Sequence, residues 1–318
     1  MPRQIIGCNI FLYYICIIRE IMFFKNFMLN IEDIKRRLKE NPEPKEVGEI
    51  RELITNSFKD LEFVENGHKY YLHNADGTKT QLKSVSETIH QFEPYVDWDE
   101  KAENKALSLG ITTDELKKQW HENNIISTAC GSKTHWFGEQ AMNMFIGKEE
   151  LTKKNMPFQY TEDGYLIPYC PKEWAITQYY TDIMNNNNVY PIMPEAKIYT
   201  NYNEMFNIKE PYAGTFDILL AYRYKGEIVC SIHDFKTNKE LFKQYQIIHN
   251  VKMLPPFDKM DFYDQPYHHY TIQLNCYQIG LMQLGLKIVD RCIIWLKDDG
   301  TYEKIKVPDI TETLVKIL

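Results

Sequence analysis

The strongest hydrophobic pattern in the chain is a pair of apolar, β-branched and aromatic runs, 214–223 and 227–235, joined at Lys225-Gly226. Runs of this composition predict strands, and a two-residue connection that contains glycine predicts a tight β-hairpin. A two-residue turn also fixes the register of the hairpin. Counted from the turn, the register places Asp217 directly opposite Asp234.

Asp217, Asp234 and Lys236 are therefore expected to converge at the open end of this hairpin. Lys236 lies two residues beyond Asp234, so its side chain points to the same face of the sheet. Two carboxylates that face each other destabilise a hairpin unless a positive charge offsets them. Because one or two carboxylates usually hold Mg²⁺ together with water and phosphate, we predict a divalent-cation site here. The alternative is a solvated strand end at which Lys236 forms a loose ion pair.

Elsewhere the apolar spacing and the turn residues predict helices alternating with strands. Helices are expected at 30–56 with a break at the prolines 42–44, and at 97–126, 127–146, 171–185 and 271–286. Strands are expected at 63–72, 80–83, 190–202, 287–295 and 301–307, and loops at 147–163 and 251–268.

Two helix starts carry the residues of a capping box, Ser84 with Glu87 and Thr112 with Glu115. Helix N-termini also bind phosphate, so Ser84 is a candidate DNA-backbone contact as well as a cap. Trp98 and Trp120 could likewise stack on bases or pack in a core.

Residues 1–29 form an apolar N-terminal extension whose segment 5–18 is too short to cross a bilayer comfortably. No small-residue cleavage site follows that segment, and Met22 and Met28 offer alternative starts. Three interpretations stay open: an upstream extension foreign to the functional domain, an ordinary buried helix, or a membrane anchor.

Composition narrows the function classes. The chain has 318 residues, 44% hydrophobic residues and a net charge of −7, so it folds around a sizeable core and is not a generally basic nucleic-acid coat. Its seven cysteines contain no CxxC pair, which argues against structural zinc and a disulfide framework and favours a reducing, cytoplasmic compartment.

Four ordered motifs resemble the signature of the PD-(D/E)XK nuclease superfamily in its RecB-like, phage-type exonuclease branch. They are GSKTHWFGE from Gly131, GTFD from Gly214, HDFKT from His233 and QLNCY from Gln273. Phe216 stands where the family name has proline, and the second acid is Asp234 rather than Glu. Both departures are ordinary variations in that branch.

The resemblance implies roles for individual residues. His135 would be a metal ligand beside Asp217 and Asp234, with the Phe235 carbonyl as a further ligand and Glu139 orienting the histidine. Glu195 matches the acidic residue on the strand before GTFD; without the resemblance it reads equally well as an exposed strand carboxylate. In the family, the pair at Gln273 and Tyr277 faces the DNA. Apart from the resemblance, Lys239 follows Lys236 closely enough to contact the phosphate backbone as it leaves the site.

The resemblance also implies a fold. We expect an α/β protein with a restriction-endonuclease-like core, in which a mixed central sheet of about five strands is flanked by helices. Residues 30–126 would form an N-terminal helical and hairpin region, in which 97–126 resembles the helical arch that covers the site in this branch. Residues 127–318 would form the nuclease core.

The function expected from these features is a Mg²⁺-dependent deoxyribonuclease, most simply an exonuclease of DNA recombination, repair or genome processing. Mn²⁺ is an alternative cofactor. No iron–sulfur cluster is expected, because the tight C-terminal cysteine group of some relatives is missing. DNA is the expected partner, with a recombination or replication protein as a further one and no stable membrane association. The rival hypotheses are a catalytically inactive nucleic-acid-binding module of the same fold and a membrane-associated protein.

Overall fold

The computed structural model describes residues 28–147, 159–201, 206 and 208–318. The predictions for the apolar segment 5–18 and for most of the loop at 147–163 lie outside these residues.

The described chain alternates between helices and strands in the following order. It contains α2 (Ile31–Glu40), α3 (Lys45–Ser57), β1 (Leu61–Val64), β2 (Lys69–His73), β3 (Lys79–Ser84), α4 (Val85–His90), α5 (Trp98–Leu109), α6 (Thr113–Phe145), α7 (Pro171–Met184), β4 (Val189–Tyr199), β5 (Tyr212–Tyr224), β6 (Glu227–Lys236), α8 (Gln244–Ile248), the 3₁₀ helix η2 (Phe257–Met260), α9 (Pro266–Met282), β7 (Ile288–Leu296), β8 (Tyr302–Lys306) and α10 (Thr311–Ile317).

The strands form one mixed sheet in the order β1-β2-β3-β5-β6-β7-β8, with β4 also paired to β5. The pairs β3–β5 and β6–β7 are parallel, and the other pairs are antiparallel. The eight strands exceed the expected five or so. One reason is that 63–72 is not a single strand: a turn with positive φ at Gly67 and His68 folds it into β1 and β2.

The central hairpin has the register that the turn predicts. Lys225 and Gly226 have φ values of 50° and 87°, as a tight primed turn requires. From Tyr224↔Glu227 the pairing runs without a shift to Ile218↔His233, which makes Asp217 and Asp234 the next opposed pair.

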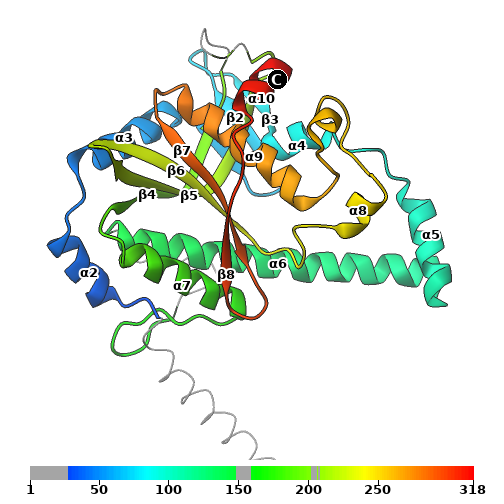
Figure 1. Ribbon diagram of the computed structural model, residues 1–318, viewed down its shortest axis with the longest axis horizontal. Helices are drawn as coiled ribbons and strands as arrows, with labels where there is room; N and C mark the ends of the chain where they lie inside the picture. The colour runs from blue at the N-terminus through cyan, green and yellow to red at the C-terminus, as the bar shows by residue number, and fades with distance from the viewer. Residues whose placement is uncertain (1–27, 148–158, 202–205, 207) are drawn as a thin grey trace, which may run out of the picture.

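Helices cover both faces of this sheet, and alternate residues of β5 enter two separate cores. Leu219 and Ala221 pack into the core under α3, α4, α9 and α10. Ile218 and Leu220 pack into the core under α2, α6 and α7. Figure 1 shows α6 and α7 below the sheet and α9 above it. The sheet is therefore covered by apolar cores on both faces.

Helix α6 is longer than expected. The two helices expected at 97–126 and 127–146 are instead α5, a Gly110 turn, and a 33-residue α6 that continues through residue 127. Its second half packs on the sheet, whereas residues 121–130 are exposed on every side. In Figure 1 the first half of α6 extends to the right of the sheet, and α5 lies beside its far end.

Both capping boxes form. The Ser84 and Thr112 side chains accept the backbone N–H of Glu87 and Glu115, and both glutamates bond back to the cap residue. Ser84 thus ends β3 and begins α4.

The C-terminal expectations hold with shifted boundaries. α9 begins at Pro266 instead of 271, and β7 and β8 form the expected antiparallel pair. A further helix that the sequence pattern did not predict, α10, follows them. Among the described helices, none has both the length and the apolar character of a membrane span.

Candidate metal and nuclease site

Asp217 is the centre of the polar site at the end of the sheet. The two strands on either side of β5 are not both paired to it at this position. β3 pairs with β5 at Tyr212 and Ala213, and β6 pairs with β5 only from Ile218 onward. The Asp217 side chain is 11% exposed. Its Oδ1 lies 2.8 Å from His135 Nδ1, and its Oδ2 accepts the Phe235 N–H at 2.6 Å. One carboxylate therefore joins α6, β5 and β6.

His135 and Asp217 form an ion pair in this arrangement. Burial alone would lower the pKa of His135, but the Asp217 carboxylate, by its charge and its hydrogen bond, raises it to about 9. Burial would likewise raise the pKa of Asp217, but His135 and the other positive groups hold it below its ordinary value. The imidazole brought from α6 is thus held beside the acid of β5, and the role of the two groups as metal ligands stays a prediction.

Asp234 and Lys236 form a second, more deeply buried pair. Their side chains are 4% and 14% exposed, and the ammonium contacts Asp234 Oδ2. Burial would lower the pKa of Lys236, but the Asp234 carboxylate raises it, so the amine stays charged. The same ammonium lies 4.3 Å from the centre of the Tyr270 ring. Lys236 is therefore fixed between a carboxylate and an aromatic face.

Glu195 has an unusual backbone conformation. It has a φ of 47°, uncommon for a residue other than glycine, between the pairs Pro194↔Ile218 and Ala196↔Phe216 of the β4–β5 ladder. That position is opposite Asp217. One ligand atom each of His135, Glu195 and Asp217 lie within 4.8 Å of one another. A strained conformation next to a polar cluster is typical of functional sites.

These three residues fit a divalent cation. Two carboxylate oxygens suit Mg²⁺ or Mn²⁺, and the imidazole nitrogen shifts the preference toward Mn²⁺. Among the described residues, Asp234 is not a member of this group, because its carboxylate faces Lys236. The role of Asp234 as a direct ligand thus stays a prediction, while Glu195, left undecided by the sequence, lies with the other two.

Glu139 lies one helical turn beyond His135 on α6. Burial raises the pKa of the Tyr180 phenol, and the charges of Asp217, Glu195 and Glu139 raise it further. Glu139 is therefore near the same site, and its proposed orientation of His135 stays a prediction.

Gln273 and Tyr277 lie on one face of α9, as their spacing requires. Gln273 Nε2 donates to the Tyr277 hydroxyl at 2.9 Å. Tyr277 is 3% exposed, and its ring packs against Gly214, where a Cβ would lie 2.6 Å from Tyr277 Cε1. Gln273 Oε1 is buried and has no hydrogen-bond partner among the described residues. Of the two, Gln273 offers the atom that a ligand or water would satisfy.

The two remaining DNA-binding candidates are Ser84 and Lys239, and Ser84 pairs with Ala213, directly before the GTFD motif. The Ser84 hydroxyl accepts the Glu87 N–H at 3.0 Å and is used as a cap. Lys239 is exposed in the segment that follows β6. Trp98 is 61% exposed and packs edge-on against Trp120, with ring centres 6.4 Å apart.

Three tyrosines near the site were missed by sequence reasoning: Tyr70, Tyr180 and Tyr270. Tyr70 comes from β2 and shares a 3.1 Å hydrogen bond with Thr215 of the GTFD motif. Only Tyr270 carried a signal, because it precedes Gln273 by three residues on the same helix.

A second group with metal-binding potential consists of Glu93, Asp264 and His269. Both ring nitrogens of His269 contact carboxylates, Glu93 at 3.4 Å and Asp264 at 3.1 Å. Among the described residues, His269 therefore belongs to a different group from His135.

Close packing at Gly138 brings His135 to the sheet. A Cβ on Gly138 would lie 2.6 Å from Phe235 Cε2, and the Phe235 ring is itself held by Tyr179 and Tyr180. Gly138→Ala is therefore expected to push α6 outward and to cost about 1–3 kcal/mol of unfolding free energy, measured by urea denaturation.

Gly131 supplies the matched control on the same helix. Its Cβ would meet nothing closer than Thr237 Oγ1 at 3.8 Å. Gly131→Ala should therefore stabilise the protein by about 0.5–1 kcal/mol through helix propensity alone. Equal effects of the two substitutions would show that the contact with Phe235 does not limit the approach of α6.

No protein-family model matches this chain, and no curated protein matches it either.

Proposed function

We propose that this protein is a metal-dependent DNA nuclease, acting as an exonuclease in DNA recombination, repair or genome processing. The observation that carries the proposal is the convergence, at one end of the central hairpin, of the His135–Asp217–Glu195 group and the Asp234–Lys236 pair. Acidic ligands beside a fixed amine form a set that can bind a cation and a phosphodiester together.

We further propose that the mixed sheet and its flanking helices are a restriction-endonuclease-like core, and that α5 with the first half of α6 is its helical arch. The order of the motifs supports this assignment. The second half of α6 supplies His135, β4 supplies Glu195, β5 and β6 supply the acids and the lysine, and α9 supplies Gln273.

His135, Glu195 and Asp217 would hold the cation, with the Phe235 carbonyl and Asp234 as further candidates. A bound Mg²⁺ or Mn²⁺ would polarise the phosphodiester and lower the pKa of a water molecule beside it. Lys236, kept charged by Asp234, would orient that water or stabilise negative charge on the phosphate in the transition state. Gln273 would position the strand through its unpaired amide oxygen.

Digestion of end-labelled linear DNA and of circular DNA tests the proposal. The full chain is expected to degrade the linear substrate in Mg²⁺ or Mn²⁺ and to be inactive in EDTA, because the acids alone supply no positive charge for the phosphate. An exonuclease would spare the closed circle. DNA binding without cleavage in either metal would contradict the proposal and favour the inactive binding module.

A further inference from the structure

The group formed by Glu93, Asp264 and His269 lies outside the proposed nuclease site. Its members come from three separate segments: Glu93 follows α4, Asp264 precedes α9, and His269 is on α9. One ligand atom of each lies within 4.8 Å of the other two, the same spacing that the group around His135 has. Within the described residues, the fold therefore brings together one histidine, one glutamate and one aspartate at a second place.

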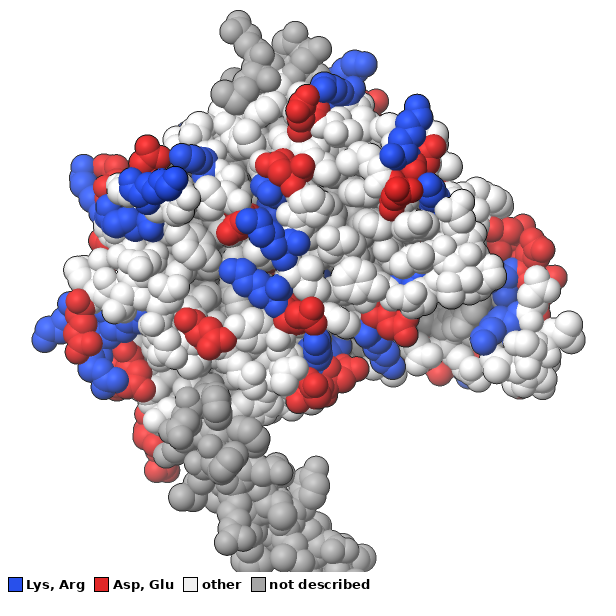
Figure 2. Space-filling model, viewed as in Figure 1, with Lys and Arg blue, Asp and Glu red and all other residues white. Residues whose placement is uncertain are grey.

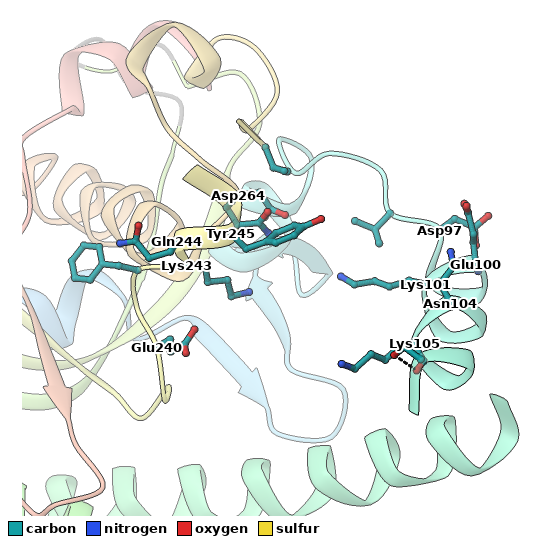
Figure 3. Close-up of a pocket in the computed structure, with 15 residues that line it drawn as sticks. Asp97, Glu100, Lys101, Asn104, Lys105, Glu240, Lys243, Gln244, Tyr245 and Asp264 are labelled. Carbon is teal, nitrogen blue, oxygen red and sulfur yellow. Dashed lines mark hydrogen bonds between the residues drawn. The ribbon is translucent and has the colours of Figure 1, made fainter. Parts of the chain in front are cut away.

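The three side chains are partly buried. Those of Glu93, Asp264 and His269 are 27%, 19% and 22% exposed. Asp264 lines a cleft of about 920 Å³ between α5 and the segment that follows β6. Figure 3 shows Asp264 on the wall of this cleft opposite α5. An ion could therefore reach the group from the cleft, while most of the surrounding water is excluded.

The main chain holds each member of the group in place. The Glu93 N–H donates to the His90 carbonyl at 3.1 Å, and the Asp264 N–H donates to the Val251 carbonyl at 2.9 Å. His269 is fixed by the helix α9. The group is thus set by the fold and does not depend on the chance meeting of long surface side chains.

The contacts inside the group leave a ring nitrogen unsatisfied. His269 Nε2 lies 3.1 Å from Asp264 Oδ1, but it is buried and makes no hydrogen bond with any described residue. His269 Nδ1 lies 3.4 Å from Glu93 Oε1, beyond the range of about 2.7–2.9 Å for a charged hydrogen bond. Buried polar atoms normally have a partner. A cation between the ring and the carboxylates would supply one.

Zinc fits this set of donors. Three protein ligands of the imidazole and carboxylate type, completed by water, form a common tetrahedral zinc site. The bonds are about 2.0–2.2 Å long, so neighbouring ligand atoms lie about 3.3 Å apart. Side-chain rotations that bring the atoms about 1 Å closer would close the group around the ion.

Positive groups near Asp264 narrow the choice of cation. The contact with His269 lowers the pKa of Asp264, burial opposes this, and Lys243 and Lys101 lower it further. Asp264 is therefore a carboxylate, the form that binds metal. The two ammonium groups also repel a cation, which disfavours Mg²⁺ and Ca²⁺ because oxygen ligands hold these ions mainly by charge. Zn²⁺ gains in addition from the imidazole nitrogen.

Ordinary surface acids look different from this group. On the face seen in Figure 2, most acidic side chains lie beside basic ones. Such exposed pairs are common and contribute little. Here a partly buried histidine meets two acids from distant segments, and one of its nitrogens has no hydrogen bond among the described residues.

We propose that Glu93, Asp264 and His269 form a zinc site that joins the linker before α5 to the start of α9. His90 Nδ1 lies 2.9 Å from Glu93 Oε1 and would orient that carboxylate from outside the ligand set. The cysteine pattern of the chain argues only against a zinc site made of cysteines, so it does not conflict with this one.

The ion would have a structural role. Tyr270 follows His269 on α9, its ring lies 4.3 Å from the Lys236 ammonium, and its hydroxyl donates to Asn238 Oδ1 at 2.6 Å. An ion at His269 would hold the first turns of α9 and with them this ring. The site needs no DNA and no cleavage, so the proposal stands apart from the nuclease function.

Zinc binding is measured on the variant Asp217→Asn, which loses a ligand of the proposed nuclease site and keeps this group intact. The full chain is stripped with EDTA, freed of the chelator and titrated with Zn²⁺ against a chromophoric chelator. We expect one zinc ion per chain. Excess zinc should raise the Tm by about 3 °C or more, because the ion binds only the folded chain.

Second substitutions in the same background identify the ligands. Asp217→Asn/His269→Ala should weaken zinc binding by more than about a hundredfold, since loss of an outer partner alone costs about 10–100-fold. Asp217→Asn/Glu93→Gln keeps the size of the side chain and should also weaken it, which guards against a folding defect of the alanine variant. The matched control is Asp217→Asn/His121→Ala, which removes an exposed histidine of α6 and should bind zinc like Asp217→Asn.

The outcomes separate this proposal from the nuclease. Failure of Asp217→Asn to bind zinc, or equal affinities of the His269→Ala and His121→Ala double variants, would overturn the zinc site. DNA cleavage by the wild type together with either result would leave the nuclease standing. Zinc bound through His269, with no cleavage by the wild type in Mg²⁺ or Mn²⁺, would support the zinc site and refute the nuclease.

Discussion

Asp217→Asn is expected to lower metal-dependent DNA cleavage by about a thousandfold or more, because one substitution removes both a ligand charge and the partner of His135. The asparagine can still accept the Phe235 N–H through its oxygen. It then turns an amide donor toward His135 Nδ1, where the carboxylate accepted before. The contact with the Phe235 N–H is kept, while the negative charge is lost and the group that faces His135 becomes a donor.

The same variant has a readout that needs no substrate. Burial lowers the pKa of His135, and Asp217 is the main group that opposes this effect. Without the carboxylate, the pKa of His135 should fall from about 9 to near or below its ordinary value, visible in an NMR titration of the imidazole.

Glu227→Gln is the matched control for Asp217→Asn. Glu227 lies at the other end of the same hairpin, where it forms an exposed pair with Lys287. It should change neither the cleavage rate nor the His135 titration. Cleavage at the wild-type rate by Asp217→Asn would remove Asp217 from the catalytic site.

Lys236→Met is expected to abolish cleavage and to cost about 3–5 kcal/mol of stability at neutral pH, because it leaves a buried carboxylate without its partner. The Asp234 side chain is only 4% exposed. The double variant Asp234→Asn/Lys236→Met removes both charges and should recover at least about 1 kcal/mol of the loss. Urea denaturation of the single and double variants measures the coupling.

The cost of Lys236→Met should also depend on pH. Burial raises the pKa of Asp234, Lys236 opposes that rise, and the Asp217 charge adds to it. Removing the ammonium therefore raises the folded-state pKa of Asp234 further above its unfolded value. Such a group favours the folded state at low pH and loses that contribution as pH rises through the folded-state pKa. The deficit relative to wild type should be smaller at acidic pH than at neutral pH.

Lys287, which precedes β7 and pairs with Glu227 of the hairpin, gives the comparison for stability. Lys287 is 61% exposed, so Lys287→Met should change the unfolding free energy by less than about 1 kcal/mol. If Lys236→Met were equally mild and independent of pH, the pair with Asp234 would be a solvated one, and the amine would not be fixed for catalysis.

The burial of Asp234 and Lys236 also changes the effect expected of substitutions at this pair. The sequence alone suggests that Asp234→Ala or Lys236→Ala would remove activity and leave the fold intact. The burial of both side chains predicts a loss of stability as well. An inactive variant at this pair is therefore informative only when its folding is measured alongside.

Local sequence determined the hairpin and the helix starts. The glycine of a two-residue turn and the period of a strand fix the pairing, so Asp217 and Asp234 could be placed opposite each other by counting. The capping boxes at Ser84 and Thr112 were equally readable, because their bonds span three residues. Each of these features depends only on neighbours along the chain.

The make-up of the site was decided by the tertiary structure. Resemblance indicated His135, but its contact with Asp217 spans 82 residues and depends on how closely α6 approaches the sheet at Gly138. From sequence, Glu195 was equally well explained as a site residue or as an exposed strand carboxylate. The direction of its side chain depends on a positive φ within the β4–β5 ladder. Local spacing does not encode either placement.

Sequence by itself thus determined which polar residues share the end of one hairpin, because covalent spacing and the strand period leave a single register. Only the tertiary structure decided that Asp217 faces His135, that Glu195 joins them, and that a cleft opens between α5 and the segment after β6. The physical reason is that these contacts join segments far apart in the chain. Their distances are set by the packing of whole helices on the sheet, which no short stretch of sequence specifies.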